Sequence, residues 1–267
     1  MYVTRDQMAE VFADTEKVYK SDEALKAAIA KSIAGTLFYA AGNTPPLPAK
    51  KFTATKISVV KARTFETAFK IRAANPSARI AVHNFASATT PGGGVVNGSR
   101  AQEESLCRCS TLYPALNTDE NWIRYYKFHR DRRDSLYTDA SIFTPDIIAF
   151  KSDTDIPKIL PRENWLTVDV LTCAAPNLNR ADISDAELLT LHEKRARHFF
   201  SVLAANGVDI FVTGAFGCGA FRNNPSVVAQ AFKNILPDFD GCFSAIVFAI
   251  YCTPRETQNF NAFKKIL

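Results

Sequence analysis

The sequence lacks the long apolar segments of a membrane protein. None of its 267 residues lies in an unbroken apolar run as long as a bilayer span requires. The charged N-terminus MYVTRDQMAEVFADTEK contains no signal-peptide core. The chain is 47% hydrophobic and 22% charged, which is ample material for a packed core. We therefore expect a soluble, intracellular, cytoplasmic protein (nuclear if the source is eukaryotic) with no membrane partner.

The sequence also lacks the cysteine patterns of metal sites. Its six cysteines are scattered, with no C-x-x-C pair and no spacing typical of a zinc site. Several lie inside apolar runs such as VLTCAAP and DGCFSAIVFAIYC. We interpret the cysteines as reduced core residues, because buried free cysteine behaves as a small hydrophobic residue. Neither a metal nor a cofactor is expected.

Charge is neither strong nor concentrated in this chain. The net charge of +5 is compatible with an anionic ligand, but the charges are dispersed and form no block typical of a nucleic-acid-binding arm. No internal repeat and no low-complexity segment is present. We expect a monomer that does not bind nucleic acid directly.

The first convincing boundary is the segment GNTPPLPAK. Residues 4–40 carry apolar positions at helical spacing, and the glycine and three prolines that follow cannot continue a helix. We therefore predict an N-terminal helical region over residues 1–50 and a second, larger domain over residues 51–267. Within that domain, a capping box of Ser184 with Glu187 starts a long helix that Gly207 ends.

Strand and helix patterns alternate after residue 50. Apolar, β-branched runs such as KISVV, ARIAVHNFA, WLTVDVLTC, VDIFVT and FSAIVFAIY are separated by helical patterns. Continuous apolar strands that alternate with helices are typical of an α/β sheet covered on both faces. Ligands of such sheets bind beyond the carboxyl ends of the strands, and two glycine-rich loops occur at such positions.

The first loop is HNFASATTPGGGVVNGSRAQEE. Its consecutive glycines Gly92, Gly93 and Gly94 allow positive φ and a close approach of backbone N–H groups to a ligand, although a flexible surface turn is the alternative. Ser99 and the Gln102 side chain have the spacing of a capping box, which predicts that the next two residues, both glutamates, lie in the first turn of a helix. Simple complementarity to the helix dipole would also explain them.

The second loop is TGAFGCGAFRNNPSVV. A glycine-rich turn from a strand into a helix favours phosphate, because unpaired N–H groups and the helix dipole point at the ligand. Asn224 and Pro225 make a good helix start. The glycine spacing is neither the Walker A nor the dinucleotide-binding pattern, and a plain turn is the alternative. Phe216 and Phe221 flank the glycines and would either stack on a ligand or pack in the core.

The triplet GGG, a seven-residue spacer and then QEE form a motif that resembles the microbial-type poly(ADP-ribose) glycohydrolases. The resemblance continues through VHNFASATTPGGG, VLTCAAPN and VTGAFGCGAFRNNPSVVAQAF, in the order expected, and covers most of residues 55–255. It implies a macrodomain-like fold, a three-layer α/β/α sandwich with a mixed sheet and an N-terminal helical extension. Residues 1–45 resemble the accessory region of these proteins.

The resemblance also implies roles for particular residues. Glu104 would be the catalytic acid and base, Glu103 would hold ribose hydroxyls, and Gln102 would belong to the substrate-binding set. Gly92 to Gly94 would line the ribose and pyrophosphate. The loop formed by Gly217, Cys218, Gly219, Ala220 and Phe221 would wrap the diphosphate, and Phe221 and Asn84 would both contact the distal ribose.

The function implied is hydrolysis of ribose–ribose O-glycosidic bonds in poly(ADP-ribose), from the chain terminus, releasing ADP-ribose without a metal. The substrate would be the polymer or an ADP-ribosylated protein. Two alternatives are a macrodomain that binds ADP-ribose without turnover and a hydrolase that removes single ADP-ribose units from an acceptor. A helix N-terminus favours an ionised carboxylate, whereas burial favours the protonated acid, and the sequence leaves this competition open.

Overall fold

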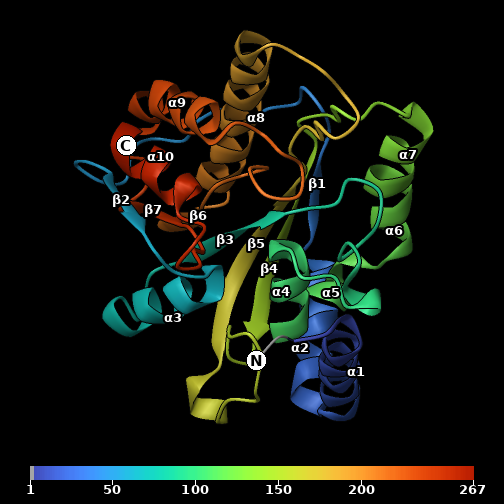
Figure 1. The fold of residues 1–267 in the computed structure, drawn as a ribbon. Helices are drawn as coiled ribbons and strands as arrows, with labels where there is room; N and C mark the ends of the chain where they lie inside the picture. The colour runs from blue at the N-terminus through green and yellow to red at the C-terminus, as the bar shows by residue number, and fades with distance from the viewer. Residues whose placement is uncertain (1–2) are drawn as a thin grey trace.

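A seven-stranded sheet forms the centre of the computed structural model, which describes residues 3–267 (Figure 1). Its spatial order is β1-β4-β5-β3-β6-β7-β2. The strands are β1 (Leu37–Tyr39), β2 (Lys56–Val60), β3 (Ile80–Phe85), β4 (Ser141–Ala149), β5 (Leu166–Cys173), β6 (Ile210–Thr213) and β7 (Ala245–Ala249).

Strand directions make this sheet mixed. β1 with β4 and β4 with β5 are antiparallel, whereas the pairs β5–β3, β3–β6, β6–β7 and β7–β2 are parallel. The carboxyl ends of the parallel strands therefore lie at one edge of the sheet, where loops lead into helices. Both glycine-rich loops leave from this edge, the first after β3 and the second after β6.

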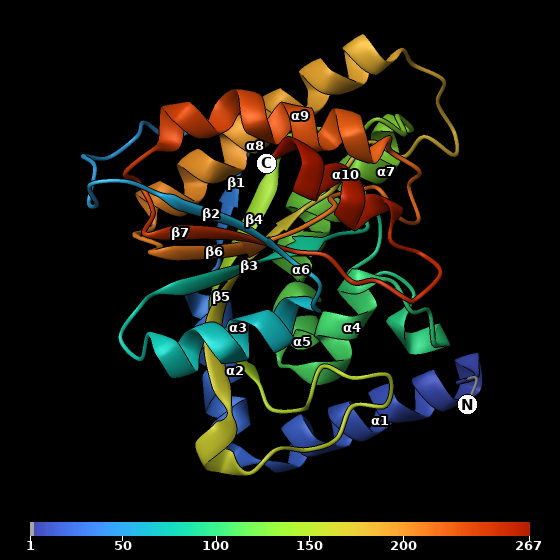
Figure 2. The same cartoon turned by 60° about the vertical axis from the view of Figure 1, so that its left-hand side comes forward.

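Helices cover both faces of the sheet. Figure 2 shows α8, α9 and α10 on one face, and α3, α4 and α5, with α1 and α2 beneath them, on the other. The α-helices are α1 (Arg5–Ser21), α2 (Glu23–Ala34), α3 (Thr64–Ala74), α4 (Gln102–Cys109), α5 (Leu112–Leu116), α6 (Asp119–Asn121), α7 (Phe128–Arg132), α8 (Asp185–Ala205), α9 (Pro225–Ile235) and α10 (Gln258–Ile266), and a π-helical stretch (Trp122–Lys127) joins α6 to α7. This arrangement confirms the predicted three-layer α/β/α fold.

Each face of the sheet has its own hydrophobic core. On β6, Phe211 packs with the aromatic residues beneath α8 and α9, whereas Ile210 and Val212 pack in the core beneath α3 and α4. Successive side chains of a strand point to opposite faces, so a strand that is buried on both must be apolar throughout. This explains the continuous apolar runs in the sequence.

The N-terminal region contributes to the same sheet and core. The continuous helix expected over residues 4–40 is wrong at its end, because β1 follows α2 and pairs with β4. Phe12 of α1 packs in the core that contains α4 and α5. The buried Lys151 donates from Nζ to Asp14 Oδ2 (2.6 Å) and Thr15 Oγ1 (2.8 Å) of α1. Whether residues 1–50 form a separate unit stays a prediction.

The predicted ends of α8 are confirmed. Ser184 Oγ accepts from the N–H of Glu187, and the Glu187 carboxylate accepts from the N–H of Ser184 at 2.8 Å. Gly207 follows the helix with a φ of 73°, which favours glycine. Within residues 3–267 no helix combines the length and apolar character that a membrane span requires.

All four histidines of the chain are buried, which predicts a loss of stability in acid. Burial lowers the pKa of His83 and His192 to about 3 and that of His129 to about 4, and it lowers the pKa of His198 as well. Below about pH 6.5 the unfolded chain binds protons that the native state does not, so the free energy of unfolding should fall by roughly 1.4 kcal/mol per pH unit for each such histidine.

Urea unfolding at pH 7 and pH 5 measures this loss of stability. Proton NMR of the folded protein tests its cause, since the C2–H resonances of His83, His129 and His192 should not titrate between pH 8 and pH 5.5. Titration of these resonances near pH 6.5 would show that the histidines are in contact with solvent.

Candidate active site

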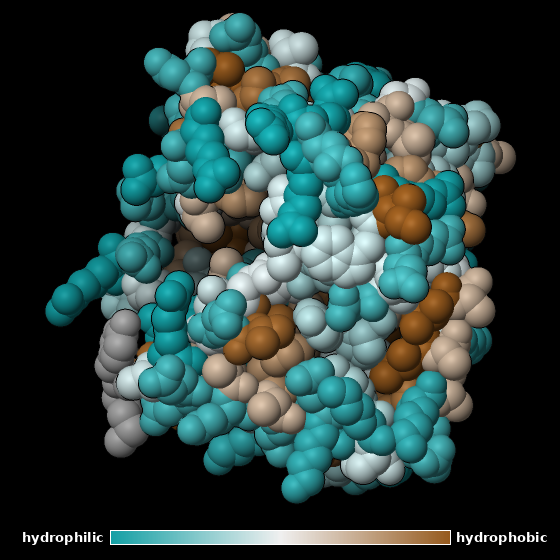
Figure 3. Space-filling model, turned by 90° about the vertical axis from the view of Figure 1, so that its right-hand side faces the viewer, coloured by the Kyte–Doolittle hydropathy of each residue, from teal (hydrophilic) through white to brown (hydrophobic). Residues whose placement is uncertain are grey.

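A cavity of about 1000 Å³ opens at the carboxyl ends of the parallel strands. It is lined by the start of α4 at Glu103 and Glu104, by the loop Gly217–Phe221 after β6, and by Tyr251 after β7. Figure 3 shows a hollow on the left of one face of the molecule, with apolar surface inside it and a hydrophilic rim. The cavity thus brings together the two glycine-rich loops that the sequence singled out.

The first turn of α4 contains both glutamates, as predicted. Glu103 and Glu104 are only 3% and 6% exposed. The predicted capping box is wrong, however: Ala101 is the N-cap residue and makes no side-chain cap hydrogen bond. Ser99 instead belongs to the preceding turn, where its N–H donates to Gly94 O at 3.1 Å.

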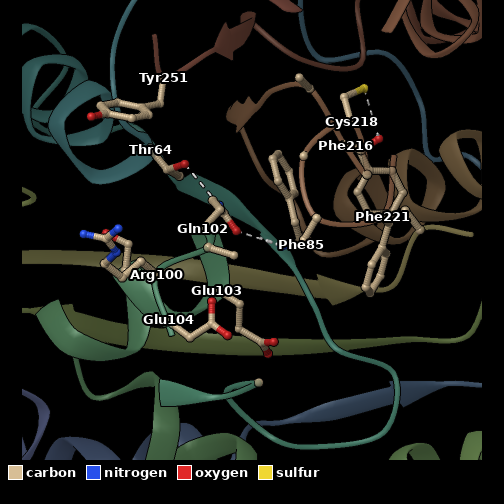
Figure 4. Close-up of a pocket in the computed structure, with 18 of the residues that line it drawn as sticks. Thr64, Phe85, Arg100, Gln102, Glu103, Glu104, Phe216, Cys218, Phe221 and Tyr251 are labelled. Atoms are coloured by element: carbon tan, nitrogen blue, oxygen red, sulfur yellow. Dashed lines mark hydrogen bonds between the residues drawn. The ribbon is translucent and has the colours of Figure 1, made fainter. Parts of the chain in front are cut away.

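Gln102 connects α4 to the end of β3. Its Oε1 accepts from the N–H of Phe85 (2.9 Å), and its Nε2 donates to His83 O (2.7 Å) and Thr64 Oγ1 (3.1 Å). Figure 4 shows Gln102 between Thr64 and Phe85. All polar atoms of this side chain thus have protein partners, so Gln102 fixes where the helix, and with it the glutamate pair, begins.

Glu103 is held from two sides. Its Oε2 accepts from the N–H of Ser87 at 2.7 Å, and its Oε1 accepts from Asn84 Nδ2 at 3.2 Å. Asn84 is fully buried and also donates to Thr172 Oγ1 at 3.2 Å. Asn84 does not line the cavity and orients Glu103 from within the protein interior. Its contact with the ribose stays a prediction.

Glu104 has one oxygen fixed and one available. Its Oε1 accepts from the N–H of Gly94 at 2.9 Å. Its Oε2 is buried and has no hydrogen-bond partner within residues 3–267. Figure 4 shows the Glu104 carboxyl group beside that of Glu103, with Arg100 on one side and Phe221 on the other. Glu104 can therefore exchange a proton with a group in the cavity.

Burial decides the protonation of Glu103. It raises the pKa of Glu103 to about 8, and the neighbouring Glu104 also raises it, against the hydrogen bond from the Ser87 N–H. The cost of removing two adjacent carboxylates from water thus exceeds the stabilisation offered by the helix N-terminus. The glutamate pair consequently keeps a proton at neutral pH.

The glycine triplet makes room for these carboxyl groups. Gly93 has a φ of 59°, and a Cβ placed on it would lie 2.5 Å from Glu104 Oε1 and 3.0 Å from Glu103 Oε2. Of the triplet, Gly93 lines the cavity, whereas Gly92 and Gly94 do not. The N–H of Gly94 is bonded to Glu104, so it does not stand open to a ligand. Contact of Gly92 and Gly94 with the substrate stays a prediction.

The second loop does present open N–H groups. Within the described part of the chain, the backbone N–H groups of Gly219, Ala220 and Phe221 have no hydrogen-bond partner, whereas that of Cys218 donates to Ala215 O at 3.1 Å. Consecutive N–H groups in a tight turn form a concave site for an anion. The loop can therefore bind a diphosphate through its backbone.

The two phenylalanines of this loop have different positions. Phe216 is 1% exposed and packs on the rings of His83 and Phe199, so it belongs to the core. Phe221 is partly exposed and lines the cavity, with its ring 6.2 Å from that of Tyr137. Both rings line the cavity, but Phe216 is held in the core, whereas Phe221 is exposed enough to stack on a ligand.

The cysteines are mostly, but not all, core residues. The expectation of burial is wrong for Cys218 and Cys252, which are partly exposed. Cys218 lines the cavity, and burial raises the pKa of its thiol well above the ordinary value, so it is not a thiolate nucleophile. Among residues 3–267 no group of three histidine, cysteine, aspartate or glutamate side chains has the arrangement of a metal site.

One cation beside the second loop lacks a carboxylate partner. Arg63 lines the cavity but pairs with Asp155, whereas the side chain of Arg180 has no partner within residues 3–267. The Arg180 segment is bonded to the loop, because Asn179 Nδ2 donates to Ala220 O at 2.6 Å. Arg180 therefore contributes positive potential close to the open N–H groups.

Sequence reasoning missed several residues of this site. Ser87 and Asn223 lie inside the two quoted loops. Of the neighbouring asparagines, only Asn224 had been assigned a role, at the start of a helix, so Asn223 was the one left to explain. Tyr137 and Tyr251 come from loops distant in sequence, and no pattern links them to the cavity.

The comparisons with known proteins agree on one family. The family description "Microbial-type PARG, catalytic domain" (PARG is poly(ADP-ribose) glycohydrolase) matches residues 7–152, which run from the first turn of α1 to just past the end of β4. The match includes α1, α2 and the glutamate pair. No curated protein sequence matches this chain.

Solved structures match almost the whole chain. Poly(ADP-ribose) glycohydrolase from Thermomonospora curvata is 29% identical, with a TM-score of 0.86 over 97% of this chain and 99% of that one. The same protein bound to the inhibitor ADP-HPD gives a TM-score of 0.84. The glycohydrolase from Deinococcus radiodurans in complex with ADP-ribose is 32% identical, with a TM-score of 0.78 over 90% of this chain and 96% of that one.

Replacing Gly93 with alanine tests whether the carboxyl groups of Glu103 and Glu104 require a residue without a side chain at this position. The new Cβ would meet Glu104 Oε1 at 2.5 Å and displace that carboxyl group, so turnover should fall about 100-fold or more. The positive φ should also cost about 1–2 kcal/mol of stability.

Gly42→Ala is the matched control, since Gly42 has a φ of 75° and no atom within 4 Å of a new Cβ. It should cost similar stability and leave turnover unchanged. Measured rates and urea midpoints separate the two effects, and normal turnover by Gly93→Ala would refute the proposed crowding.

Proposed function

This chain belongs to the microbial-type poly(ADP-ribose) glycohydrolase family, and we propose that Glu104 is the general acid and base of its glycosidase reaction. The enzyme hydrolyses the ribose–ribose O-glycosidic bonds of poly(ADP-ribose). The observation that carries the assignment is the buried Oε2 of Glu104, which has no hydrogen-bond partner within residues 3–267 while the other oxygen is fixed by Gly94.

The backbone of the second loop binds the diphosphate. The N–H groups of Gly219, Ala220 and Phe221 supply donors, and Arg180 supplies positive charge beside them. Backbone donors on a fixed turn hold the phosphates at one position without the entropy cost of ordering long side chains. The distal ribose then lies between this loop and the glutamate pair, with Phe221 covering the sugar.

Bond cleavage requires one proton. The bond between C1 of the distal ribose and the glycosidic oxygen breaks through a transition state that resembles an oxocarbenium ion, and the bonding electrons stay on the oxygen. In this proposal the oxygen takes its proton from Glu104 Oε2, the carboxyl oxygen that has no protein partner within residues 3–267. The products of this step are the shortened polymer, with a free hydroxyl, and a cationic ribose beside a carboxylate.

Water completes the reaction. A water molecule adds to C1, and its proton passes to the Glu104 carboxylate, which returns the glutamate pair to its starting state. Glu103, held by Ser87 and Asn84, is well placed to bind ribose hydroxyls and to keep the sugar facing Glu104. One glutamate thus acts first as acid and then as base, unlike the usual pair of opposed carboxylates in glycosidases.

The variant Glu104→Gln tests this assignment. Its amide oxygen can still accept the Gly94 N–H, so the local structure should persist, but the proton donor is lost. Release of ADP-ribose from polymer should fall by a factor of about 10² to 10⁴. Calorimetry should find that ADP-ribose binds nearly as it does to the wild type.

Parallel assays on polymer and on mono-ADP-ribosylated protein distinguish the proposed activity from its two alternatives. Turnover of polymer by Glu104→Gln at the wild-type rate would refute the role of Glu104. Tight binding of ADP-ribose by the wild type without product would favour a macrodomain that binds ADP-ribose without turnover. Release only from the mono-ADP-ribosylated protein would favour a hydrolase that removes single ADP-ribose units from an acceptor. Attack from the chain terminus, a monomeric state and a cytoplasmic location stay predictions.

The pH profile should report the proton that the pair retains. The pKa of Glu103 is raised to about 8, so the proton is present below that pH and is lost as the pH rises through it. We expect kcat/KM for free polymer to decline above about pH 8 with the slope of a single proton. Thermal unfolding over the same range controls for loss of the fold. A rate that is constant up to pH 9.5 would refute the retained proton.

A further inference from the structure

The second glycine loop is held from behind by one buried side chain. Asn223 is 2% exposed and makes four side-chain hydrogen bonds. The two hydrogens of its Nδ2 are shared among three carbonyl oxygens, those of Pro176 (2.7 Å), Gly217 (3.1 Å) and Phe221 (3.1 Å). Its Oδ1 accepts from His192 Nε2 at 2.7 Å. Three segments of the chain, α8 included, therefore meet at this amide.

The direction of these bonds requires an amide with its NH₂ facing the loop. Three carbonyl oxygens can only accept, so the group among them must donate. The amide oxygen of Asn223 then faces Nε2 of His192, also 2% exposed, so the neutral imidazole must carry its hydrogen on Nε2 and donate it. Burial lowers the pKa of His192 to about 3, which leaves it neutral with a single N–H. The orientation of Asn223 is thus specified from both ends.

These bonds also set the direction of the peptide groups in the turn. The carbonyl groups of Gly217 and Phe221, at the two ends of the turn, point inward to Asn223. Gly217 has a φ of 78°, and a Cβ on it would lie 2.9 Å from Asn223 Nδ2, so only glycine allows this approach. The turn held at these two ends carries the N–H groups of Gly219, Ala220 and Phe221, which have no hydrogen-bond partner within residues 3–267.

We propose that Asn223, oriented by His192, is a positioning residue that directs the N–H groups of Gly219, Ala220 and Phe221 at the diphosphate of the substrate. The inference rests on the proposed function, which supplies that diphosphate. Neither Asn223 nor His192 lines the cavity, so any effect of these residues on ligand binding passes through the loop.

The isosteric variant Asn223→Asp tests the proposal. It replaces the NH₂ by a carboxylate oxygen among three carbonyl oxygens, which repel it. The Kd for ADP-ribose, measured by calorimetry, should rise at least about tenfold. Hydrogen exchange of the bonded amides of the turn, those of Cys218 and Arg222, should become faster in the protein without ligand. KM for polymer should rise more than kcat falls, because Glu104 is not touched.

Asn224→Asp is the matched control. It makes the same chemical change one residue later, at the exposed N-cap of α9, where Oδ1 accepts from the N–H of Ser226 at 3.1 Å. It also places an oxygen where Nδ2 donates to Asp185 Oδ2 (3.2 Å), but both side chains are exposed to water, which screens the repulsion. Aspartate caps a helix as well as asparagine does. Binding and loop exchange in this variant should therefore stay within about twofold of the wild type, and an equal loss in both variants would show a nonspecific charge effect.

The partner residue provides a second test if Asn223→Asp does not fold. His192→Leu removes the donor to Asn223 Oδ1 and should weaken ADP-ribose binding. His192→Gln restores an amide donor and should recover much of that loss, which a merely structural role in the core would not predict.

The two proposals fail in distinguishable ways. A folded Asn223→Asp protein with wild-type affinity and wild-type exchange at the amides of Cys218 and Arg222 would overturn the positioning role. So would loss of binding in His192→Leu that His192→Gln does not restore. Failure of the wild type to bind ADP-ribose would instead overturn the proposed function, while the exchange measurement would still report on Asn223.

Discussion

The site depends on the burial of two adjacent carboxyl groups against a glycine. Glu103 and Glu104 converge on Gly93, are almost inaccessible to water, and are each held by a backbone N–H group. Like charges in such surroundings cannot both ionise at low cost, so the pair keeps a proton. The glutamates lie on α4, and the glycine turn and the loop at the end of β3 hold their carboxyl groups in place. The proposed acid–base chemistry depends on that constraint.

The two glycine-rich loops use the same residue for opposite purposes. In the first, glycine removes a side chain so that carboxyl groups can approach, and the N–H of Gly94 is bonded within the protein. In the second, Gly217 allows the carbonyl groups to turn inward, which leaves consecutive N–H groups open to an anion. In the proposed mechanism, one loop therefore holds the group that reacts and the other binds the substrate. Glycine content alone does not distinguish these roles, because both depend on partners elsewhere in the chain.

Most of the fold and part of the site could be predicted from sequence, for physical reasons. Long apolar strands such as β5 and capped helices such as α8 carry local signals, and the motif placed both glutamates in a first helical turn. β1 was missed because three residues at a sheet edge form no pattern. The Ser99 cap failed because that residue takes part in the preceding turn. The role of Asn223 could not be predicted, since its partners lie up to 47 residues away.

The N-terminal helices support α4, the helix that carries the two glutamates. Thr15 Oγ1 donates to Arg108 O at 2.6 Å, which ties α1 to α4. A Cβ on Gly98 would lie 1.9 Å from Arg5 O, so α1 begins directly against the turn that leads into α4. The family match that starts at residue 7 is consistent with this packing. Residues that sequence patterns describe only as an accessory region therefore form the outer support of the catalytic helix.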